Sequence, residues 1–328
     1  MMKLYGVDIG YGFTKVAGVD RIPRVIPSIV GSNEELSYRS DIGDRIKIAP
    51  LVLDGHSYLV GEAAKRFSRH RYRIFDSTWA ESPYYLLLFV SALTMMIIDK
   101  SADELAAVVT GLPVSHYTQE RVKQLQDLLG QTHSVQTLSG EASLKVERVK
   151  VIPQPFGSYF DLLLNDEGKL KEPEKIHERV GIIDIGFQTT DLALATPQFV
   201  EASSGSLEVG VRSVADQLSR DLARKYSVTF DTTEAEEVLR QKSVKIFGEI
   251  VDLSEMIEIR TREVAEVILS FAHSLWGRGE RLDRVILSGG GAISFRSYFS
   301  GYPNLYIPGE PSLSNVRGYL KLARKTKW

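Results

Sequence analysis

Two short stretches of this sequence place an aspartate and a glycine where an apolar strand would be expected to continue. The first is VDIGYGFTK at residues 7–15, and the second is IDIGFQTTD at residues 183–191. When the stretches are aligned, Asp8 pairs with Asp184, and a glycine follows each aspartate two positions later. Glycines let backbone N–H groups approach an anion such as phosphate, and an aspartate before such a turn is suited to hold Mg²⁺ or its waters. The spacing therefore predicts two phosphate-binding turns.

The residues after each turn add groups that bind phosphate. Lys15 supplies a positive charge for phosphate oxygens, and Thr14, Thr189 and Thr190 offer hydroxyls. A third stretch, VILSGGGA at residues 285–292, is an apolar run that ends in consecutive glycines. Glycines at the carboxyl end of a strand permit close contact with a nucleotide. The sequence contains neither the G-x-x-x-x-G-K-[ST] phosphate loop nor a G-x-G-x-x-G that leads from the first strand into a helix.

Two hairpins must position these turns. The apolar period is close to two over residues 4–19 and again over residues 179–195, and each run is interrupted at its glycine. This pattern predicts strand, tight turn, strand. The two copies lie too far apart for a solenoid repeat, so their separation favours two related domains.

The remaining segments mix predicted strands with predicted helices, which indicates an α/β protein. In the first half we expect a hairpin at 46–60 with Asp54 and Gly55 as its turn, a helix at 84–98, a strand at 106–111, a helix at 118–129 and a strand at 144–152. In the second half we expect helices at 209–226, 233–247, 254–276 and 312–325, a strand at 284–287, and a linker before them at 165–177. The helix at 84–98 is too short to cross a bilayer, so it is expected to be buried.

Composition narrows the function classes. The chain has 328 residues, and 40 Lys and Arg balance 42 Asp and Glu, which argues against a globally basic nucleic-acid binder. A basic run at 65–73, KRFSRHRYR, is expected to be a solvated face rather than a DNA contact. There is no Cys, which excludes disulfides, thiolate metal sites and a Cys nucleophile. No secretory signal opens the sequence, so a cytoplasmic location is expected.

Taken together, the motifs resemble those of the actin, Hsp70 and sugar-kinase ATPase superfamily. DIGYGFTK is similar to the first phosphate motif, DIGFQTTD to the second and LSGGGA to the adenosine motif. VIPQPFGSYF at 151–160 resembles the first interdomain connecting segment, and PSLSNVRGYLKLA at 311–323 resembles the second. The last stretch and the compact length are most similar to the ParM/StbA plasmid-segregation actins and their archaeal actin-like relatives.

The resemblance implies a fold and its domains. It implies an α/β fold of two related actin/ribonuclease-H-like domains with a nucleotide cleft between them. Domain I would comprise residues 1–157 and 304–328 with a small inserted subdomain at about 31–75, and domain II would comprise residues 158–303.

The resemblance also implies ATP or ADP with Mg²⁺ as ligands, and it assigns roles. Asp8 and Asp184 would organise Mg²⁺ and the attacking water, Lys15 would reach the β- and γ-phosphates, and Gln154 would orient the hydrolytic water. Phe187 stands where the family often has a second glycine. The implied nucleotide-binding residues lie in the two turns, in the glycine run and in the helices between: Gly10, Tyr11, Gly12, Phe13, Thr14, Lys15, Gly186, Phe187, Gln188, Thr189, Thr190, Gly210, Glu237, Lys242, Gly289, Gly290 and Gly291, with Arg240 as a further candidate.

The function that follows from the resemblance is an ATPase that forms nucleotide-dependent filaments for plasmid or DNA segregation or as a cytoskeletal element. Its expected partners are further copies of itself and a DNA-bound adaptor protein, without direct insertion into a membrane. Two alternatives stay open at this point: a small-molecule kinase of the sugar or acetate type, and an ATP-binding cell-division scaffold.

Overall fold

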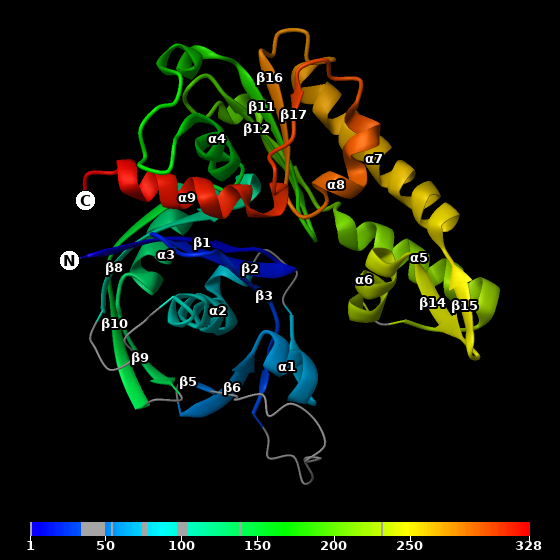
Figure 1. Ribbon diagram of the computed structural model, residues 1–328, viewed down its shortest axis with the longest axis horizontal. Helices are drawn as coiled ribbons and strands as arrows, with labels where there is room; N and C mark the ends of the chain where they lie inside the picture. Colours follow the sequence, from blue (N-terminus) through cyan, green and yellow to red (C-terminus); the bar gives the residue numbers. More distant parts are fainter. Residues whose placement is uncertain are drawn as a thin grey trace. The chain divides into compact units, whose positions relative to one another are not determined.

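The computed structural model describes residues 2–33, 50–53, 55–73, 78–96, 104–137, 140–230 and 232–328. The chain forms two compact units: unit 1 comprises Met1–Pro173 and Leu313–Trp328, and unit 2 comprises Glu174–Ser312. Each unit contains a mixed β-sheet with helices packed against it (Figure 1). The α/β class predicted from the sequence is confirmed.

Unit 1 is built on a six-stranded sheet with the order β3-β2-β1-β8-β10-β9. Its strands are β1 (Lys3–Ile9), β2 (Phe13–Gly18), β3 (Arg24–Pro27), β8 (Glu104–Leu112), β9 (Thr132–Thr137) and β10 (Gly140–Pro153). Strands β1, β8 and β10 run parallel, whereas β1, β2 and β3 form an antiparallel meander. The carboxyl ends of the parallel strands therefore meet at one edge of the sheet, which is where α/β proteins place their ligands.

Helices cover both faces of this sheet. They are α2 (Pro83–Thr94), α3 (Gln119–Leu129), α4 (Phe156–Leu163) and α9 (Ser314–Lys325), and α2 and α9 lie on opposite sides of β1 (Figure 1). The predicted start of α2 is confirmed, because the Tyr85 N–H donates to the Ser82 hydroxyl and Pro83 is the first helical residue. None of the helices in the described residues is long and apolar enough to cross a membrane.

A small four-stranded sheet with the order β5-β6-β4-β7 accompanies the large one. Its elements are β4 (Val30–Ser32), β5 (Leu51–Leu53), β6 (His56–Val60), β7 (Arg71–Tyr72) and the short helix α1 (Glu62–Phe67). The predicted hairpin is confirmed from Leu51 onwards, while residues 46–49 and 54 lie outside the described residues. Of the predicted inserted subdomain at about 31–75, residues 34–49, 54 and 74–75 also lie outside them.

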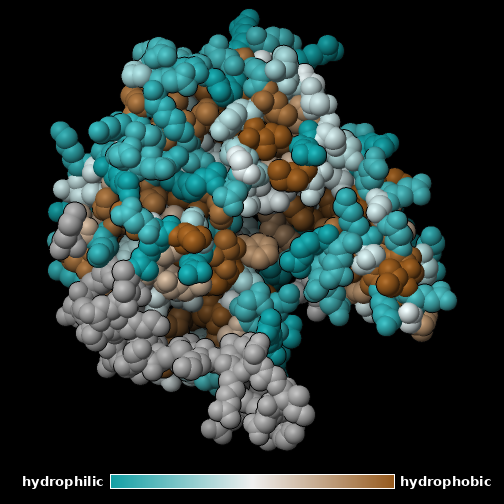
Figure 2. Space-filling view, viewed as in Figure 1, coloured by the Kyte–Doolittle hydropathy of each residue, from teal (hydrophilic) through white to brown (hydrophobic). Residues whose placement is uncertain are grey.

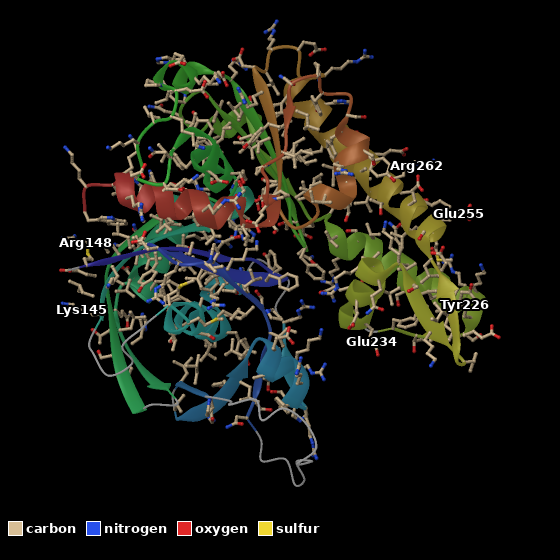
Figure 3. All side chains as sticks on the ribbon, in the orientation of Figure 1. Lys145, Arg148, Tyr226, Glu234, Glu255 and Arg262 are labelled. Carbon is tan, nitrogen blue, oxygen red and sulfur yellow. The ribbon has the colours of Figure 1, made fainter. Side chains whose placement is uncertain are left out.

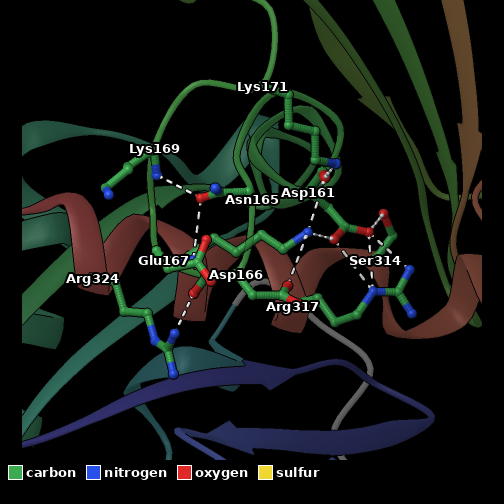
Figure 4. A network of polar contacts seen from close by, with 10 residues as sticks. Asp161, Asn165, Asp166, Glu167, Lys169, Lys171, Ser314, Arg317 and Arg324 are labelled. Carbon is green, nitrogen blue, oxygen red and sulfur yellow. Dashed lines mark hydrogen bonds and ion pairs between the residues drawn. The ribbon is translucent and has the colours of Figure 1, made fainter.

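Helix α9 packs against α4 with the two backbones in direct contact. A Cβ added at Gly318 would collide with the Gly157 carbonyl, so neither larger side chains nor an alanine fit at this crossing. A buried charge network completes the contact: Asp161 on α4 accepts hydrogen bonds from Arg317 and Lys321 on α9, both at 2.8 Å (Figure 4). The chain returns to unit 1 through this helix pair.

The segment 165–177 was expected to be a linker, and the division between unit 1 and unit 2 falls within it, after Pro173. The Asn165 side chain accepts hydrogen bonds from the N–H groups of Glu167 and Lys169, which folds residues 165–169 into a tight turn (Figure 4). Gly168 takes a left-handed φ of 76° and lies against the backbone of α9. The turn is ordered because Asn165 supplies local hydrogen bonds that the charge-rich sequence pattern does not reveal.

Unit 2 repeats the central arrangement of unit 1. Its five-stranded sheet has the order β13-β12-β11-β16-β17, with β11 (Val180–Ile185), β12 (Thr190–Ala195), β13 (Gly205–Leu207), β16 (Arg284–Ser288) and β17 (Leu305–Tyr306). Strand β11 pairs antiparallel with β12 on one side and parallel with β16 on the other. Strand β1 has the same two kinds of neighbour, so both predicted hairpins are confirmed in equivalent sheet positions.

The helices of unit 2 are α5 (Val211–Tyr226), α6 (Thr232–Gln241), α7 (Ser254–Trp276) and the short α8 (Ala292–Phe295). The expected helix at 233–247 is wrong beyond Gln241, because β14 (Ser243–Ile246) and β15 (Glu249–Asp252) form a hairpin there. Lys242 ends α6 with a left-handed φ of 55°, and Phe247 and Gly248 form the turn with φ values of 49° and 93°. Positive φ at both turn residues is typical of two-residue β-hairpins.

Short 3₁₀ helices connect these elements: η1 (Trp79–Glu81), η2 (Val114–His116), η3 (Pro173–His177), η4 (Glu201–Ser203), η5 (Arg296–Phe299) and η6 (Pro311–Leu313). In unit 2, a large apolar core lies between the sheet and α7, with Ile183, Leu192, Ile268 and Leu287 among its buried members. A second core around Leu218 and Val238 holds α5 and α6 together with the inner side of the β14–β15 hairpin.

Candidate functional site

The first turn joins β1 to β2 in unit 1 and carries a buried ion pair. The strand register places Asp8 directly opposite Lys15, so both side chains lie on one face of the sheet. Lys15 Nζ donates to Asp8 Oδ2 over 2.9 Å, and the two side chains are 14% and 4% exposed. The charge of Asp8 is therefore balanced from within its own hairpin.

Gln154 lies beside this pair, although it is far from it in the sequence. Its N–H donates to the Leu112 carbonyl over 2.8 Å, which continues the pairing of β10 with β8 beyond the strand end. Its side-chain Nε2 donates to Asp8 Oδ1 over 3.5 Å, and the Tyr319 hydroxyl from α9 donates to its carbonyl over 3.2 Å. The structure thus brings together three of the predicted site residues of unit 1: Asp8, Lys15 and Gln154.

Ser28 and Arg73 hold the backbone of the first turn, and the sequence did not single out either of them for this role. Ser28 donates from its hydroxyl to the Gly10 carbonyl over 2.6 Å and from its N–H to the Gly12 carbonyl over 2.9 Å. Arg73 Nη2 also contacts the Gly12 carbonyl, at 3.4 Å. The expectation of a merely solvated basic run at 65–73 is therefore wrong for Arg73, which serves the turn.

Several predicted nucleotide-binding residues of the first turn have structural contacts of their own. Thr14 Oγ1 and Ser28 Oγ form a buried hydrogen bond of 2.9 Å. The Tyr11 ring packs against Trp79, with ring centroids 5.3 Å apart, and Tyr11 is 7% exposed. Phe13 is 41% exposed. Thr14 and Tyr11 thus stabilise the turn from inside.

A neutral tyrosine lies beneath the turn. Burial strongly raises the pKa of Tyr85, and the charge of Asp8 adds to that shift. Tyr85 therefore carries no charge at physiological pH, which leaves Asp8 and Lys15 as the charged pair at this turn.

The second turn joins β11 to β12 in unit 2 and places two carboxylates on the same face. Asp184 lies directly opposite Asp191 in the register, and the two residues are 7% and 3% exposed. Asp191 accepts hydrogen bonds from the Ser206 hydroxyl on β13 and from Thr189 Oγ1, the latter at 3.5 Å. Thr190 donates to the Val209 carbonyl over 2.7 Å. Sequence reasoning missed Asp191, although the alignment of the two stretches already pairs it with Lys15.

The glycine run lies directly beside Asp184. Gly289 has a φ of 90°, its N–H donates to the Pro311 carbonyl over 3.0 Å, and a Cβ at this position would collide with Asp184 Oδ1. Gly291 donates to the Ile185 carbonyl over 2.9 Å, whereas Gly290 faces open space. Only glycine satisfies both the left-handed backbone and the close approach at position 289.

The N-terminus of α5 closes the second turn. Arg212 donates from its N–H to the Phe187 carbonyl and from Nη1 to Gln188 Oε1, each over 2.8 Å. A Cβ at Gly210 would lie 2.6 Å from the Phe187 carbonyl oxygen and 2.7 Å from that of Gly186, which explains the glycine there. The turn after β11 and the start of α5 therefore bring together four of the predicted residues: Gly186, Phe187, Gln188 and Gly210. Arg212 is an additional member of this group.

Two predicted adenosine contacts lie elsewhere in unit 2. Glu237 is exposed on α6 and accepts a hydrogen bond of 3.1 Å from Gln241. Lys242 ends the same helix, and its carbonyl accepts a hydrogen bond from the Leu253 N–H over 2.9 Å. Their role in binding, like that of Arg240, stays a prediction.

The carboxylates of Asp8 and Asp184 are suitable ligands for a Mg²⁺ ion whose remaining ligands are waters and phosphate oxygens. Among the described residues, no group of three or more His, Asp or Glu side chains could hold a metal ion. Mg²⁺ usually takes only one or two carboxylates and completes its shell with waters and substrate phosphates. Asp8 and Asp184 are carboxylates of this kind, and we retain both as candidates.

Comparison with known proteins identifies the class. Residues 6–157 match the family model for the N-terminal domain of actin-like proteins, and residues 182–301 match the model for the C-terminal part of the archaeal actin homologue, MreB-like family. Both units thus belong to the actin-like fold, as expected from the motifs. The chain is an actin-like protein, related to the ParM proteins and to the archaeal actin homologues.

Individual relatives support this assignment. The chain is 26% identical over 349 residues to an archaeal actin homologue of Thermoplasma volcanium, with 99% of this chain and 100% of the relative covered. It superimposes on the archaeal actin homologue Ta0583 in complex with ADP with a TM-score of 0.81, 23% identity, and 99% and 100% coverage. A 15-stranded ParM filament from Clostridium botulinum gives a TM-score of 0.81 at 22% identity, with 99% of each chain covered.

Proposed function

We propose that this chain is an ATPase that binds Mg-ATP with the turns of both hairpins and assembles into nucleotide-dependent filaments. The observation that carries the proposal is the repeated arrangement of a buried aspartate before a glycine turn, in the same sheet position of both units. Its support from relatives is the ADP bound to Ta0583 and the filament formed by a ParM protein.

Each chemical group at the two turns has a distinct proposed role. Lys15 binds the β- and γ-phosphates, and the glycine run beside Asp184 leaves room for the nucleoside. Asp8 and Asp184 hold Mg²⁺, directly or through its waters, and Mg²⁺ neutralises phosphate charge when it is bound. The Lys15 ammonium and the metal would share the negative charge of the phosphates with the two carboxylates.

Gln154 is proposed to orient the attacking water. Its amide nitrogen donates to Asp8 Oδ1, so its amide oxygen is directed to accept a hydrogen bond from a water. An amide is too weak a base to remove the proton, so the role of Gln154 is positioning, which phosphoryl transfer tolerates.

Hydrolysis is proposed to control assembly. A nucleotide held by two units favours one arrangement of those units while the γ-phosphate is present, and its loss removes that preference. Head-to-tail contacts between identical chains give an open filament when the rotation between them does not close a ring. Segregation of plasmid or other DNA through a DNA-bound adaptor, or a cytoskeletal role in the cytoplasm, is the use we propose for such filaments.

The test combines phosphate release with light scattering and negative-stain imaging, in Mg-ATP, in Mg-ADP and without nucleotide. We expect phosphate release without any added acceptor, and filaments that require nucleotide. Turnover that requires a sugar or acetate acceptor would instead favour a kinase, and absence of nucleotide binding would contradict the proposal.

The Gln154→Ala variant tests the mechanism. We expect hydrolysis to slow by about tenfold or more while ATP affinity stays within about twofold, because Gln154 acts on the water and not on the nucleotide. The control is Gln124→Ala on the exposed surface of α3, where only a contact with Glu120 is lost. Equal losses of affinity and turnover in the Gln154 variant would remove its assigned role.

A further inference from the structure

A row of four polar side chains crosses the sheet of unit 2 at the level of Asp184. The strand register pairs Asp184 on β11 with Asp191 on β12, and it pairs Asp191 with Ser206 on β13. On its other side, Asp184 is paired with Ser288, the last residue of β16. Paired residues of neighbouring strands point to the same face of a sheet, so all four line one face of β13, β12, β11 and β16 (Figure 1). We call these four residues the polar row.

The two serines at the ends of the polar row differ in their bonding. Ser206 donates a hydrogen bond from its hydroxyl to Asp191 Oδ1. Ser288 Oγ is shielded from solvent and has no hydrogen-bond partner within the described part of the chain. Ser288 is 0% exposed, and Asp184 beside it is 7% exposed. The hydroxyl at one end of the row is therefore satisfied, and the hydroxyl at the other end is not.

Burial makes the unpaired hydroxyl of Ser288 unfavourable. Polar groups at the surface are satisfied by water, as for Glu255 and Arg262, which Figure 3 shows on the outer side of α7. Hydrophilic side chains of this kind cover much of the surface seen in Figure 2. A buried hydroxyl cannot bond to bulk water, so most buried polar groups are hydrogen-bonded within the protein or to a bound group. We therefore expect the partner of Ser288 to come from outside the chain.

The backbone after Ser288 brings β16 against the carboxylate of Asp184. Gly289 has a left-handed φ of 90°, and a Cβ at this position would collide with Asp184 Oδ1. Asp184 Oδ1 therefore lies against the backbone of the residue that follows Ser288. Gly290 faces open space. The carboxylate and the unpaired hydroxyl are thus neighbours at the carboxyl end of two parallel strands, which is where α/β sheets bind their ligands.

Unit 1 has a polar group beside its aspartate as well, but that group is bonded. The parallel pairing of β1 with β8 ends at Val7 and Thr110, so Gly111 is the next residue, level with Asp8. Gln154 Cγ lies 2.9 Å from the place that a Cβ of Gly111 would occupy. Gln154 thus takes the space beside Asp8 and donates to its carboxylate. The unpaired hydroxyl is therefore a feature of the polar row in unit 2.

A magnesium ion at Asp184 would bring a suitable partner with it. Mg²⁺ usually keeps several waters when one or two carboxylates hold it, and a hydroxyl can accept a hydrogen bond from such a water. We propose that Ser288 is a positioning residue of the magnesium site, and that its hydroxyl accepts a hydrogen bond from a water of the Mg²⁺ ion held by Asp184. The inference rests on the proposed function, because it requires Asp184 to bind Mg²⁺ together with the nucleotide.

This role predicts different effects of Ser288→Ala with and without the ligand. Without nucleotide and Mg²⁺, the substitution removes a buried polar atom that has no partner, so the protein should be no less stable. With Mg²⁺ and nucleotide, the variant lacks an acceptor for the metal-bound water, so the contribution of Mg²⁺ to binding should fall. A serine with a merely structural role would instead lower the stability of the free protein and leave the contribution of Mg²⁺ unchanged.

The first experiment measures urea unfolding by circular dichroism in EDTA without nucleotide. We expect the midpoint of Ser288→Ala to equal or exceed that of the natural protein. The matched comparison is Ser206→Ala at the other end of the polar row, which should lower the midpoint because Asp191 loses a hydrogen-bond donor. A midpoint for Ser288→Ala as low as that of Ser206→Ala would show a structural role and overturn the inference.

The second experiment measures the dissociation constant of ADP by titration calorimetry, once with Mg²⁺ and once with EDTA. The ratio of the two constants gives the gain in affinity due to Mg²⁺. Ser288→Ala should reduce this gain by about fivefold, the size expected for one hydrogen bond, while affinity in EDTA stays within about twofold. The control is Ser270→Ala at an exposed position on α7, which should keep the full gain.

The outcomes separate the inference from the function on which it rests. If Mg²⁺ strengthens ADP binding equally in the natural chain and in Ser288→Ala, the inference is overturned and the proposed function stands. A loss of affinity of the same size with Mg²⁺ and with EDTA would place Ser288 at the nucleotide itself and also overturn the inference. If the natural chain binds no ADP, or gains nothing from Mg²⁺, the magnesium part of the proposed function fails, and the inference fails with it.

Discussion

The two glycine-turn hairpins have the same strand pairing, but different residues lie opposite their aspartates. Asp8 lies opposite Lys15, and a 2.9 Å ion pair joins them. Asp184 occupies the same position in unit 2, but the residue opposite is a second carboxylate, Asp191. Like charges directly opposite each other on a sheet are destabilising, whereas opposite charges attract. The first hairpin thus places a cation opposite its aspartate, and the second places another carboxylate there.

The difference suggests how the duplicated motif was divided between two tasks. Two buried carboxylates in unit 1 are paired with cations. Lys15 binds Asp8, and Arg317 and Lys321 bind Asp161. In unit 2, Asp191 accepts a hydrogen bond from the Ser206 hydroxyl. Two carboxylates on one face suit a divalent cation, so we propose that Asp184 is the principal magnesium residue and that the first hairpin mainly binds phosphate through Lys15.

The largest effect is expected from Asp184→Asn, which should reduce ATP turnover by about a hundredfold or more because the charge that holds the metal is lost. Phosphate release in Mg-ATP measures it, with Glu266→Gln on the exposed face of α7 as the control. Turnover close to that of the natural protein would contradict the assignment of Asp184 as the principal magnesium residue.

Lys15→Met should destabilise the nucleotide-free protein by about 3 kcal/mol, because Asp8 is left as a buried charge without its cation. Urea unfolding followed by circular dichroism measures the change. Lys123→Met, at an exposed position on α3, should leave the unfolding midpoint almost unchanged. A loss as small as that of the control would show that the ion pair does not balance Asp8.

The pH dependence of stability tests whether cations stabilise the buried carboxylates of unit 1. Burial alone would raise the pKa of Asp161, but hydrogen bonds and charge from Arg317 and Lys321 outweigh burial and hold the pKa below its usual value of 3.8. A lowered folded-state pKa means that the stabilisation is present above the unfolded pKa and is lost as the pH falls through the folded pKa.

We therefore expect Asp161→Asn to be less stable than the natural protein by about 2 kcal/mol at pH 7, and the difference to shrink as the pH falls below about 4. Unfolding midpoints measured at a series of pH values provide the test, with Asp127→Asn on the exposed side of α3 as the control. A difference that is constant across this range would show that the charge of Asp161 contributes nothing.

The smallest effect is expected from Asp191→Asn, and its sign is opposite to that of Lys15→Met. Removing the carboxylate opposite Asp184 should stabilise the nucleotide-free protein by about 0.5 kcal/mol, since one like-charge contact disappears while the amide can still accept from Ser206. Denaturant unfolding without nucleotide measures it. A destabilisation of similar size would mean that the two aspartates do not repel each other.

Local patterns in the sequence were sufficient to find the hairpins and their aspartates. The period of two, the glycines at the turns and the Ser82–Pro83 helix start depend on residues that are close in the chain, and the structure confirms each of them. The same kind of reasoning failed at residues 243–247, where a helical pattern appeared to continue. There the left-handed Lys242 and the pairing of β14 with β15 prevailed over helical propensity.

Contacts between distant residues could not be read from these patterns. Ser28 and Arg73 both bind the carbonyl of Gly12, and Arg212 binds Gln188, although no sequence pattern assigned any of the three to a turn. The alignment of the two stretches already showed a lysine, Lys15, where the second copy has an aspartate, Asp191. Only the strand register showed that these residues lie directly opposite Asp8 and Asp184.

The sequence by itself determined the α/β class, the duplicated turns and the family, because turn glycines, strand periodicity and motif spacing are local properties of the chain. Only the tertiary structure decided which cations neutralise which carboxylates and that Gln154 meets Asp8. These features depend on the folding of distant segments against one another. The electrostatic interactions of a buried charge and the exposure of a side chain are set by the residues that surround it in space, not by its neighbours in the chain.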